Sequence, residues 1–207
     1  MKKFLSLMLA AVILFSLTAC ADIRPSGDKI SVISSIFPSY DFAKKICEGV
    51  EGTEVSMLIT PGTEPHSYEP GVRDMAKIKE CDLFIYLGGE SDEWVESLLE
   101  TFDSGEINTL KMTDCVELLG EEDIEGMRHS HDSHEEAHGE NDEHVWTSPV
   151  NAVLISEKIK DKLCSADPQN KDKYTQNFEE YKKEIDWFQA HGLHDFHIHF
   201  RDPEGQD

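Results

Sequence analysis

From Lys29 onward the sequence alternates between short β-rich runs and stretches with helical spacing, and this order constrains the fold more than any other feature. The third β-rich run, residues 83–87, is continuously apolar, which is typical of a strand covered on both faces. The four predicted strands are residues 30–36, 54–59, 83–87 and 108–112. Strands that alternate with helices indicate βαβ units. We therefore predict an α/β fold with a parallel sheet flanked by helices.

Apolar residues at a period of three to four predict helices between and after these runs. The predicted helices are residues 40–47, 70–79, 92–102 and 149–163, and a longer helix that starts after Pro168 and continues toward Trp187. Pro70 and Pro149 are placed as first helical residues. The loops ahead of these two helices should therefore be held by proline at low entropic cost.

The amino terminus has the order of a bacterial lipoprotein signal. A lysine pair precedes an apolar run that is too short to span a bilayer comfortably, and small residues then lead to Cys20. This order matches a lipobox, in which cleavage exposes a cysteine that is then acylated. We predict a signal peptide over residues 1–19, lipidation at Cys20 and a tether over residues 20–28. The mature chain should be extracytoplasmic and lipid-anchored to the cell membrane, with an ordinary signal peptide as the alternative.

Charge and cysteine content exclude some classes of partner and site. The chain carries 42 acidic and 19 basic residues, a formal net charge of -23, so nucleic acid is not an expected partner. Such a surface suits either the attraction of cations or the solubility of an exposed protein, and charge alone does not decide between them. No pair of cysteines has C-x-x-C spacing. We expect mostly buried thiols, with one or two disulfides as a possibility outside the cell.

Two histidines stand in matching contexts, each about one turn ahead of a predicted helix. His66 lies in a turn-rich segment after a strand, and His144 lies just before Ser148 and Pro149, which are typical of a helix cap and first turn. In open α/β sheets ligands bind beyond the carboxyl ends of strands, so at least His66 belongs where a site is expected. Neutral imidazole is a strong zinc ligand, which makes both residues candidate ligands.

Residues 121–143 interrupt the alternation with a low-complexity stretch rich in His, Glu, Asp and Ser. It has no apolar period and predicts a mobile loop. Closely spaced histidines among acidic residues favour weak zinc binding, because the order that binding imposes on a loop opposes it. These accessory candidates are His129, His131, His134 and His138. A solvated insert without a metal role is the alternative.

The segments around His66 and His144 resemble the two signature segments of the metal-binding solute-binding proteins of ABC transporters, the zinc and manganese uptake family. They read Thr-Pro-Gly-Thr-Glu-Pro-His-Ser-Tyr-Glu-Pro and Asp-Glu-His-Val-Trp-Thr-Ser-Pro. Residues 33–40, Ile-Ser-Ser-Ile-Phe-Pro-Ser-Tyr, resemble the first strand and helix of the same family. The resemblance covers about residues 29–185.

This resemblance implies that His66 and His144 bind a metal from an amino-terminal lobe, and that Asp142 and Glu143 orient His144. Zinc is favoured over manganese, because a histidine-rich loop is common in zinc-specific relatives and nitrogen ligands suit zinc. The implied function is an extracytoplasmic zinc-binding component of an ABC-type uptake transporter, which delivers the ion to a membrane permease without enzymatic activity. A manganese-binding homologue and a surface adhesin are the alternatives within the family.

The carboxyl-terminal part departs from the family. Relatives carry a second lobe that supplies the remaining ligands, whereas the residues after about Trp187 match no family segment, so we expect a truncated or frame-altered copy with the second lobe missing. His197 and His199 alternate with apolar residues and suggest an extracellular metallohydrolase, but without an H-E-x-x-H arrangement to support it. The predicted units are an amino-terminal metal-binding lobe (29–166, including the loop 121–143), a long connecting helix (167–190) and an atypical tail (191–207).

Overall fold

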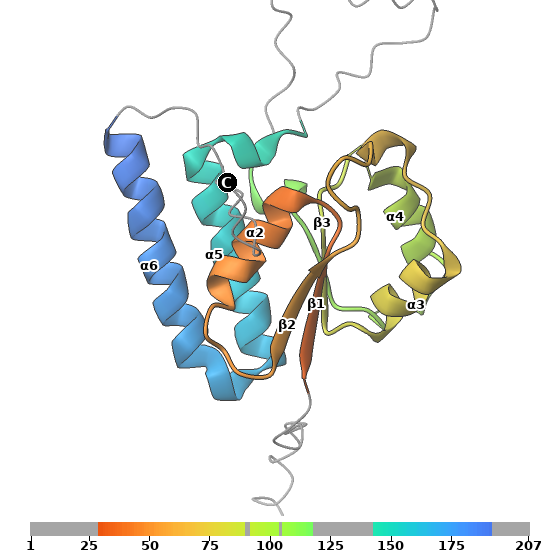
Figure 1. The fold of residues 1–207 in the computed structure, drawn as a ribbon, viewed down its shortest axis with the longest axis horizontal. Helices are drawn as coiled ribbons and strands as arrows, with labels where there is room; N and C mark the ends of the chain where they lie inside the picture. Colours follow the sequence, from red (N-terminus) through yellow and green to blue (C-terminus); the bar gives the residue numbers. More distant parts are fainter. Residues whose placement is uncertain (1–28, 90–91, 104, 118–142, 192–207) are drawn as a thin grey trace, which may run out of the picture.

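The computed structural model describes residues 29–89, 92–103, 105–117 and 143–191. Four strands form one parallel sheet in the order β2-β1-β3-β4 (Figure 1). The strands are β1 (Ile30–Ser34), β2 (Thr53–Met57), β3 (Leu83–Tyr86) and β4 (Thr109–Lys111). The α-helices are α2 (Phe37–Ile46), α3 (Val72–Glu80), α4 (Glu93–Leu99), α5 (Pro149–Ala166) and α6 (Lys171–Ala190). Within the described ranges, no helix is both long and apolar enough to cross a bilayer.

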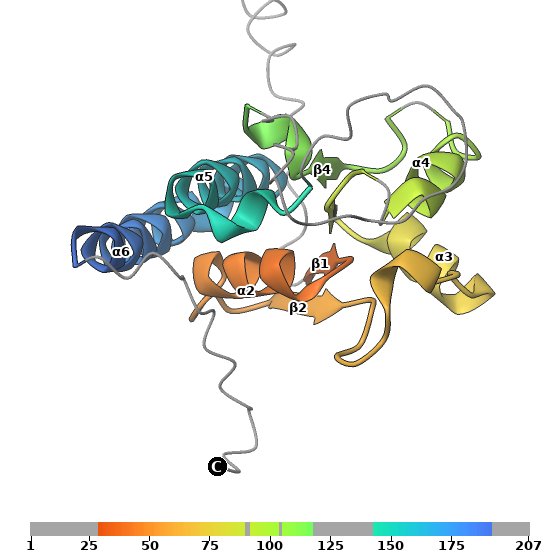
Figure 2. The ribbon, with the colours of Figure 1, turned by 90° about the horizontal axis from the view of Figure 1, so that it is seen from above.

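Helices cover both faces of the sheet, so the structure has two apolar cores. α2, α5 and α6 lie on one face, and α3 and α4 lie on the other (Figures 1 and 2). Successive residues of a strand point to opposite faces. β3 accordingly gives Leu83 and Ile85 to the first core, and Phe84 and Tyr86 to the second. All four are buried, which confirms the prediction of a strand covered on both faces and the α/β fold class.

The strand order places a reversal of the chain between β1 and β3. From β1 the chain passes through α2 to β2 on one side, and then through α3 to β3 on the other side of β1. The two connections use opposite faces of the sheet. In open α/β sheets such a reversal opens a crevice beyond the carboxyl ends of the strands, where ligands bind.

Of the two prolines predicted as first helical residues, only one starts a helix. The prediction that Pro70 is a first helical residue is wrong, because Gly71 is the N-cap of α3 and its N–H donates to Asp74 Oδ2 at 3.1 Å. The prediction for Pro149 is confirmed, since Ser148 caps α5 with its side chain. The difference lies in the cap, because Asp74 reaches back to the amide of Gly71 and fixes the start there.

α6 belongs to the first core although it follows all four strands. Tyr174, Phe178, Tyr181 and Ile185 form a buried stripe at helical spacing along α6. Asn177 Nδ2 donates to the carbonyls of Ile46 and Glu48, each at 2.8 Å. These bonds satisfy carbonyls at the end of α2 that have no partner within that helix. α6 therefore packs on the lobe from Tyr174 to Ile185.

The four cysteines in the described ranges are free thiols. Cys47 is buried, and Cys81, Cys115 and Cys164 are half-buried. Burial raises the pKa of Cys47 to about 12. Since a thiol with so high a pKa is rarely ionised at neutral pH, Cys47 acts as a small apolar side chain in the first core.

We expect the packing of α6 to be visible in the free energy of unfolding. Phe178 is 3% exposed, so Phe178→Ala should lower the free energy of unfolding by about 3 to 5 kcal/mol by leaving a cavity. Trp187 lies on the same helix and is 53% exposed, so the matched Trp187→Ala should change it by less than about 0.5 kcal/mol. Urea unfolding followed by circular dichroism measures both. Equally small losses would contradict a core role for α6.

Candidate functional site

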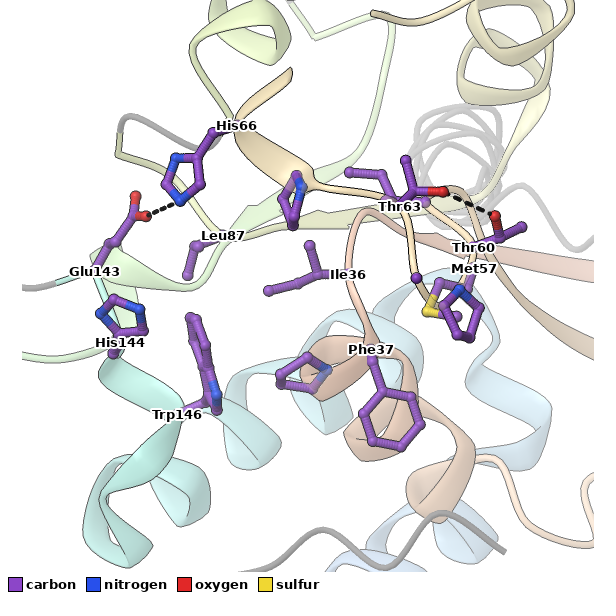
Figure 3. A pocket seen from close by; sticks show the side chains of 15 residues that line it. Ile36, Phe37, Met57, Thr60, Thr63, His66, Leu87, Glu143, His144 and Trp146 are labelled. Carbon is purple, nitrogen blue, oxygen red and sulfur yellow. Dashed lines mark hydrogen bonds and ion pairs between the residues drawn. The ribbon is translucent and has the colours of Figure 1, made fainter. Parts of the chain in front are cut away.

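A pocket of about 310 Å³ opens at the carboxyl ends of β1, β2 and β3, where the strand order reverses (Figure 3). The turn after β1, the loop after β2 and Leu87 after β3 form part of its wall. The segment just ahead of α5 closes the remaining side with Glu143, His144 and Trp146. Both histidines predicted as candidate ligands, His66 and His144, line this one pocket.

His66 is carried by a short 3-10 turn, Pro65–Ser67, in the loop after β2. The N–H of His66 donates to Glu64 Oε1 at 3.5 Å, and the N–H of Tyr68 donates to the Pro65 carbonyl at 3.1 Å. The Tyr68 hydroxyl donates to Asp74 Oδ2 at 3.1 Å and so fixes the far end of the turn to α3. The imidazole of His66 is 56% exposed, which leaves it accessible from solvent.

His144 is placed by a second 3-10 turn, Val145–Thr147, of which it is the N-cap. Its carbonyl accepts from the N–H and from the hydroxyl of Thr147, at 3.1 and 2.8 Å. Val145 is buried in the first core and anchors this turn, while the His144 ring lies against Trp146 with centroids 5.2 Å apart. The turn thus holds His144 at the wall of the pocket.

Glu143 connects this segment with the loop after β2. Its Oε1 lies 4.0 Å from His66 Nε2, and its side chain is only 13% exposed. Behind it the carboxylate rests against the backbone of Gly89, where a Cβ would lie 2.6 Å from Oε2. Gly89 also has a φ of 94°, which L side chains rarely adopt, so position 89 suits glycine on both counts. The sequence predicts that Glu143 orients His144, whereas in the structure its carboxylate faces His66.

Asp92 lies beneath this arrangement and joins the ends of two strands. Its Oδ2 accepts from the N–H of Leu87 at 2.6 Å, from the N–H of Gly88 at 3.4 Å and from the Ser35 hydroxyl at 3.1 Å. The residue is fully buried, and Oδ1 has no hydrogen-bond partner among the described residues. Burial raises the pKa of Asp92; the three hydrogen bonds oppose this, and the nearby charge of Glu143 adds to it.

The remaining predicted site residues lie outside the described ranges. They are Cys20, His129, His131, His134 and His138, together with Asp142, His197 and His199. Asp92 was not predicted from the sequence as part of the site. An aspartate ahead of a helical pattern signals an N-cap, and Asp92 is the N-cap residue of α4. No sequence pattern indicated its burial or its hydrogen bond with Ser35, which follows β1.

The described side chains offer two imidazoles and one carboxylate at the pocket. As placed, no three His, Cys, Asp or Glu side chains of the described part are gathered closely enough to hold a metal ion. The donor types nevertheless match zinc, which takes imidazole nitrogen and carboxylate oxygen. Trp146, Leu87 and Ile36 make one side of the pocket apolar.

Residues 32–191 match the family model described as the periplasmic component A of the zinc-uptake complex. The chain belongs to this family. The zinc-binding lipoprotein AdcA of Streptococcus pneumoniae is 37% identical over 187 residues, which cover 89% of this chain and 36% of AdcA. The high-affinity zinc uptake system protein ZnuA of Bacillus subtilis is 31% identical over 186 residues, covering 87% of this chain and 57% of that protein.

Solved structures of similar proteins have the same fold. The Zn(II)-bound ZnuA-like domain of Streptococcus pneumoniae AdcA matches with a TM-score of 0.63 and 31% identity, over 78% of this chain and 54% of that domain. A mutant of the laminin-binding adhesin Lmb of Streptococcus agalactiae matches with a TM-score of 0.62 and 27% identity, over 78% of this chain and 55% of that one. The chain thus spans less than two thirds of each of these relatives.

The raised pKa of Asp92 predicts how its charge affects stability. A carboxyl whose pKa is higher in the folded chain binds its proton more tightly there, so its contribution to stability is greatest below the ordinary pKa of 3.8. That contribution is lost as the pH rises through the folded pKa. Asp92→Asn carries no charge and keeps an acceptor oxygen. At pH 7 its free energy of unfolding should therefore be equal to or higher than that of the parent. The difference between the two should increase as the pH rises from low values.

The matched variant Asp92→Ala should behave differently. It leaves two backbone N–H groups and the Ser35 hydroxyl without their acceptor and should cost about 2 to 4 kcal/mol. Urea unfolding at several pH values compares both variants with the parent. If Asn and Ala lose equal stability at pH 7, the carboxylate charge itself is needed and the expectation is wrong.

Proposed function

We propose that this chain captures zinc outside the cytoplasm between His66 and His144 and delivers it to the membrane permease of an ABC transporter. The observation that carries the proposal is the meeting of these two histidines, from loops far apart in the sequence, in one pocket at the carboxyl ends of the strands. The names of the relatives, a zinc-binding lipoprotein and a zinc uptake protein, support it. Zinc is the cargo here, and no reaction is proposed.

The donor set supports zinc over manganese. Two imidazole nitrogens suit zinc, whereas manganese prefers oxygen ligands. Two histidines fill only half of a tetrahedral zinc site, so a metal held by this pair alone keeps positions open to water or to further groups. A partly open site allows both capture from solution and transfer to a receiving protein.

The surroundings of the pair favour reversible capture. His66 is exposed on its turn and offers an approach from solvent, while His144 stands on a turn fixed to the core by Val145. The net charge of -23 raises the local concentration of cations around the chain. Two prepositioned loops then bind the ion without the ordering cost that a long mobile segment carries.

Delivery requires the chain to remain at the membrane. We propose that Cys20 carries the lipid and that residues 20–28 form the tether. A tether of this kind keeps the chain on the same membrane surface as the permease, which raises the effective concentration of the chain near the permease. The lipoprotein name of the pneumococcal relative supports this part of the proposal.

The zinc site is tested by removing both histidines. The parent chain should bind about one tight zinc equivalent in a competition titration against a chromophoric chelator. His66→Ala and His144→Ala should each weaken the tight site by about tenfold or more, roughly 1.4 kcal/mol, and the double variant should lose it. Unchanged affinity in the double variant would rule the site out.

The control for this titration is deletion of residues 128–139, which contain His129, His131, His134 and His138. We expect these histidines to be accessory, because immobilising a polar segment costs about 1 to 2 kcal/mol of backbone entropy per residue. The deletion should remove weak additional equivalents and leave the tightest site nearly intact. A loss of tenfold or more at limiting zinc would place the segment in the primary site.

Delivery is tested separately, with the permease and ATPase of an ABC zinc transporter reconstituted in liposomes. The zinc-loaded chain should stimulate ATP hydrolysis several-fold over zinc alone. The double variant His66→Ala, His144→Ala should give no stimulation. If the loaded chain is equally inactive, delivery is contradicted while zinc capture stands.

A further inference from the structure

β2 forms one edge of the sheet, because the strand order within the described residues is β2-β1-β3-β4. Figure 2 shows β2 at the rim of the fold, with α2 beside it. β2 has five residues, Thr-Glu-Val-Ser-Met, and all five are paired with β1. The other side of β2 faces no further strand of the described part of the chain. Such an edge presents backbone N–H and C=O groups to which another extended chain can bind.

The backbone groups that point outward from this edge belong to the odd-numbered residues of β2. In a parallel pair, alternate residues direct both backbone groups at the neighbouring strand. Gly52 and Leu58, just outside the two ends of β2, hydrogen-bond with the backbone of β1 at 2.7 and 2.8 Å. The even-numbered residues between them therefore face β1. Thr53, Val55 and Met57 face away from it and can bond with an added strand.

β2 lacks the features that protect many edge strands. Natural edge strands are often short or carry lysine, proline or a bulge, which discourage pairing with another chain. β2 has neither lysine nor proline, and its register with β1 is continuous. The opposite edge differs, since β4 has only three residues, ends in Lys111 and shares a groove with Lys158 and Lys162. Of the two edges of the described sheet, β2 is therefore the one that suits an added strand.

The sequence of β2 is self-complementary when two copies pair antiparallel about Val55. In that register Val55 lies opposite Val55 of the second copy, and Thr53 lies opposite Met57 of the second copy. All three residues direct their backbone groups outward, so these are the hydrogen-bonded pairs of an antiparallel ladder. Glu54 lies opposite Ser56 of the second copy, whose hydroxyl can donate to the carboxylate. A register centred on Glu54 would instead place like charges opposite each other.

The charges beside this edge are mixed, although the whole chain has a net charge of -23. Glu54 is exposed on one side of the strand. On the other side, a groove of about 460 Å³ between α2 and β2 is lined by Asp41 and Glu48 and also by Lys44 and Lys45. Both signs of charge therefore lie at the edge. The repulsion between two whole chains is screened by salt, with a Debye length of about 8 Å at physiological ionic strength.

We propose that two copies of this chain associate through β2, in an antiparallel register centred on Val55. The two sheets then form one continuous sheet, with a two-fold axis between the two Val55 residues. This contact is isologous, because the same surface of each copy is buried, so it closes as a dimer. Met57 also lines the pocket of His66 and His144, so the contact adjoins that pocket without containing either histidine.

The register is tested by disulfide formation in extracts of cells that make the full chain. Chains with Glu54→Cys and chains with Ser56→Cys, made together, should cross-link on mild oxidation. Opposite residues of a non-hydrogen-bonded pair have Cα atoms about 4.5 Å apart, which is within disulfide reach. Either variant made alone places its two cysteines on a diagonal of about 7 to 8 Å, which is beyond that reach. The mixture should therefore give about fivefold more dimer on a non-reducing gel than either variant alone.

Proline substitutions at the two edges provide matched controls. Val55→Pro, added to both chains, removes an outward N–H and should lower the yield of dimer about fivefold or more. Thr109→Pro makes the same change on β4, where Asn108 and Met112 bond with β3 and Thr109 therefore faces outward. This variant should leave the yield unchanged. Circular dichroism melts check that both variants are folded, and the comparison of the cysteine chains does not depend on either proline.

Salt dependence distinguishes a backbone contact between two negative chains from an ion-paired contact. The yield of dimer should rise as the ionic strength increases from about 0.01 to 0.15 M, because salt screens the repulsion between the copies. A contact held by ion pairs would weaken over the same range. A falling yield would therefore contradict the proposal.

The inference is overturned if the mixture cross-links no more than the single variants, or if Val55→Pro has no greater effect than Thr109→Pro. A cross-linked product whose mass is not that of two chains would place a different protein at the edge and would also overturn it. The double variant His66→Ala, His144→Ala should cross-link as the parent does. Failure of the zinc site thus leaves this inference standing, and failure of the dimer leaves the zinc site standing.

Discussion

The buried carboxylate of Asp92 is the interaction on which the pocket depends. It accepts hydrogen bonds from the end of β3 and from Ser35 just past β1, and so holds the two strands together where the strand order reverses. The backbone that it fixes continues into Gly89, on which the Glu143 carboxylate rests. The position of the pocket wall beside His66 is therefore set by an acid that is fully buried.

The rest of the fold supplies rigidity to the loops of the pocket. β3 is buried on both faces, and the two cores pack against opposite sides of it. α6 adds a long apolar stripe to the first core and caps the end of α2 through Asn177. The loops at the carboxyl ends of the strands therefore extend from a framework fixed on both sides, which is how a scaffold places binding residues with little entropic cost.

The pocket combines an apolar lining with two imidazoles and a carboxylate. Ile36, Leu87 and Trp146 are among its apolar lining residues, His66 is open to solvent, and imidazole and carboxylate are donor types that zinc takes in proteins. The chain spans 36% of pneumococcal AdcA and 57% of ZnuA of Bacillus subtilis, and within that span it carries both histidines of the pocket.

The sequence by itself determined the α/β class, the approximate position of each strand in the described residues, the cap at Ser148 and the two pocket histidines. Local patterns predict these features: apolar periodicity, turn residues and the short segments around His66 and His144. Only the tertiary structure decided that Glu143 faces His66, that Asp92 is buried between two strand ends and that α6 completes the first core. Local patterns cannot supply such facts, because each depends on the distance between segments far apart in the chain, and that distance is fixed by the packing of the whole lobe.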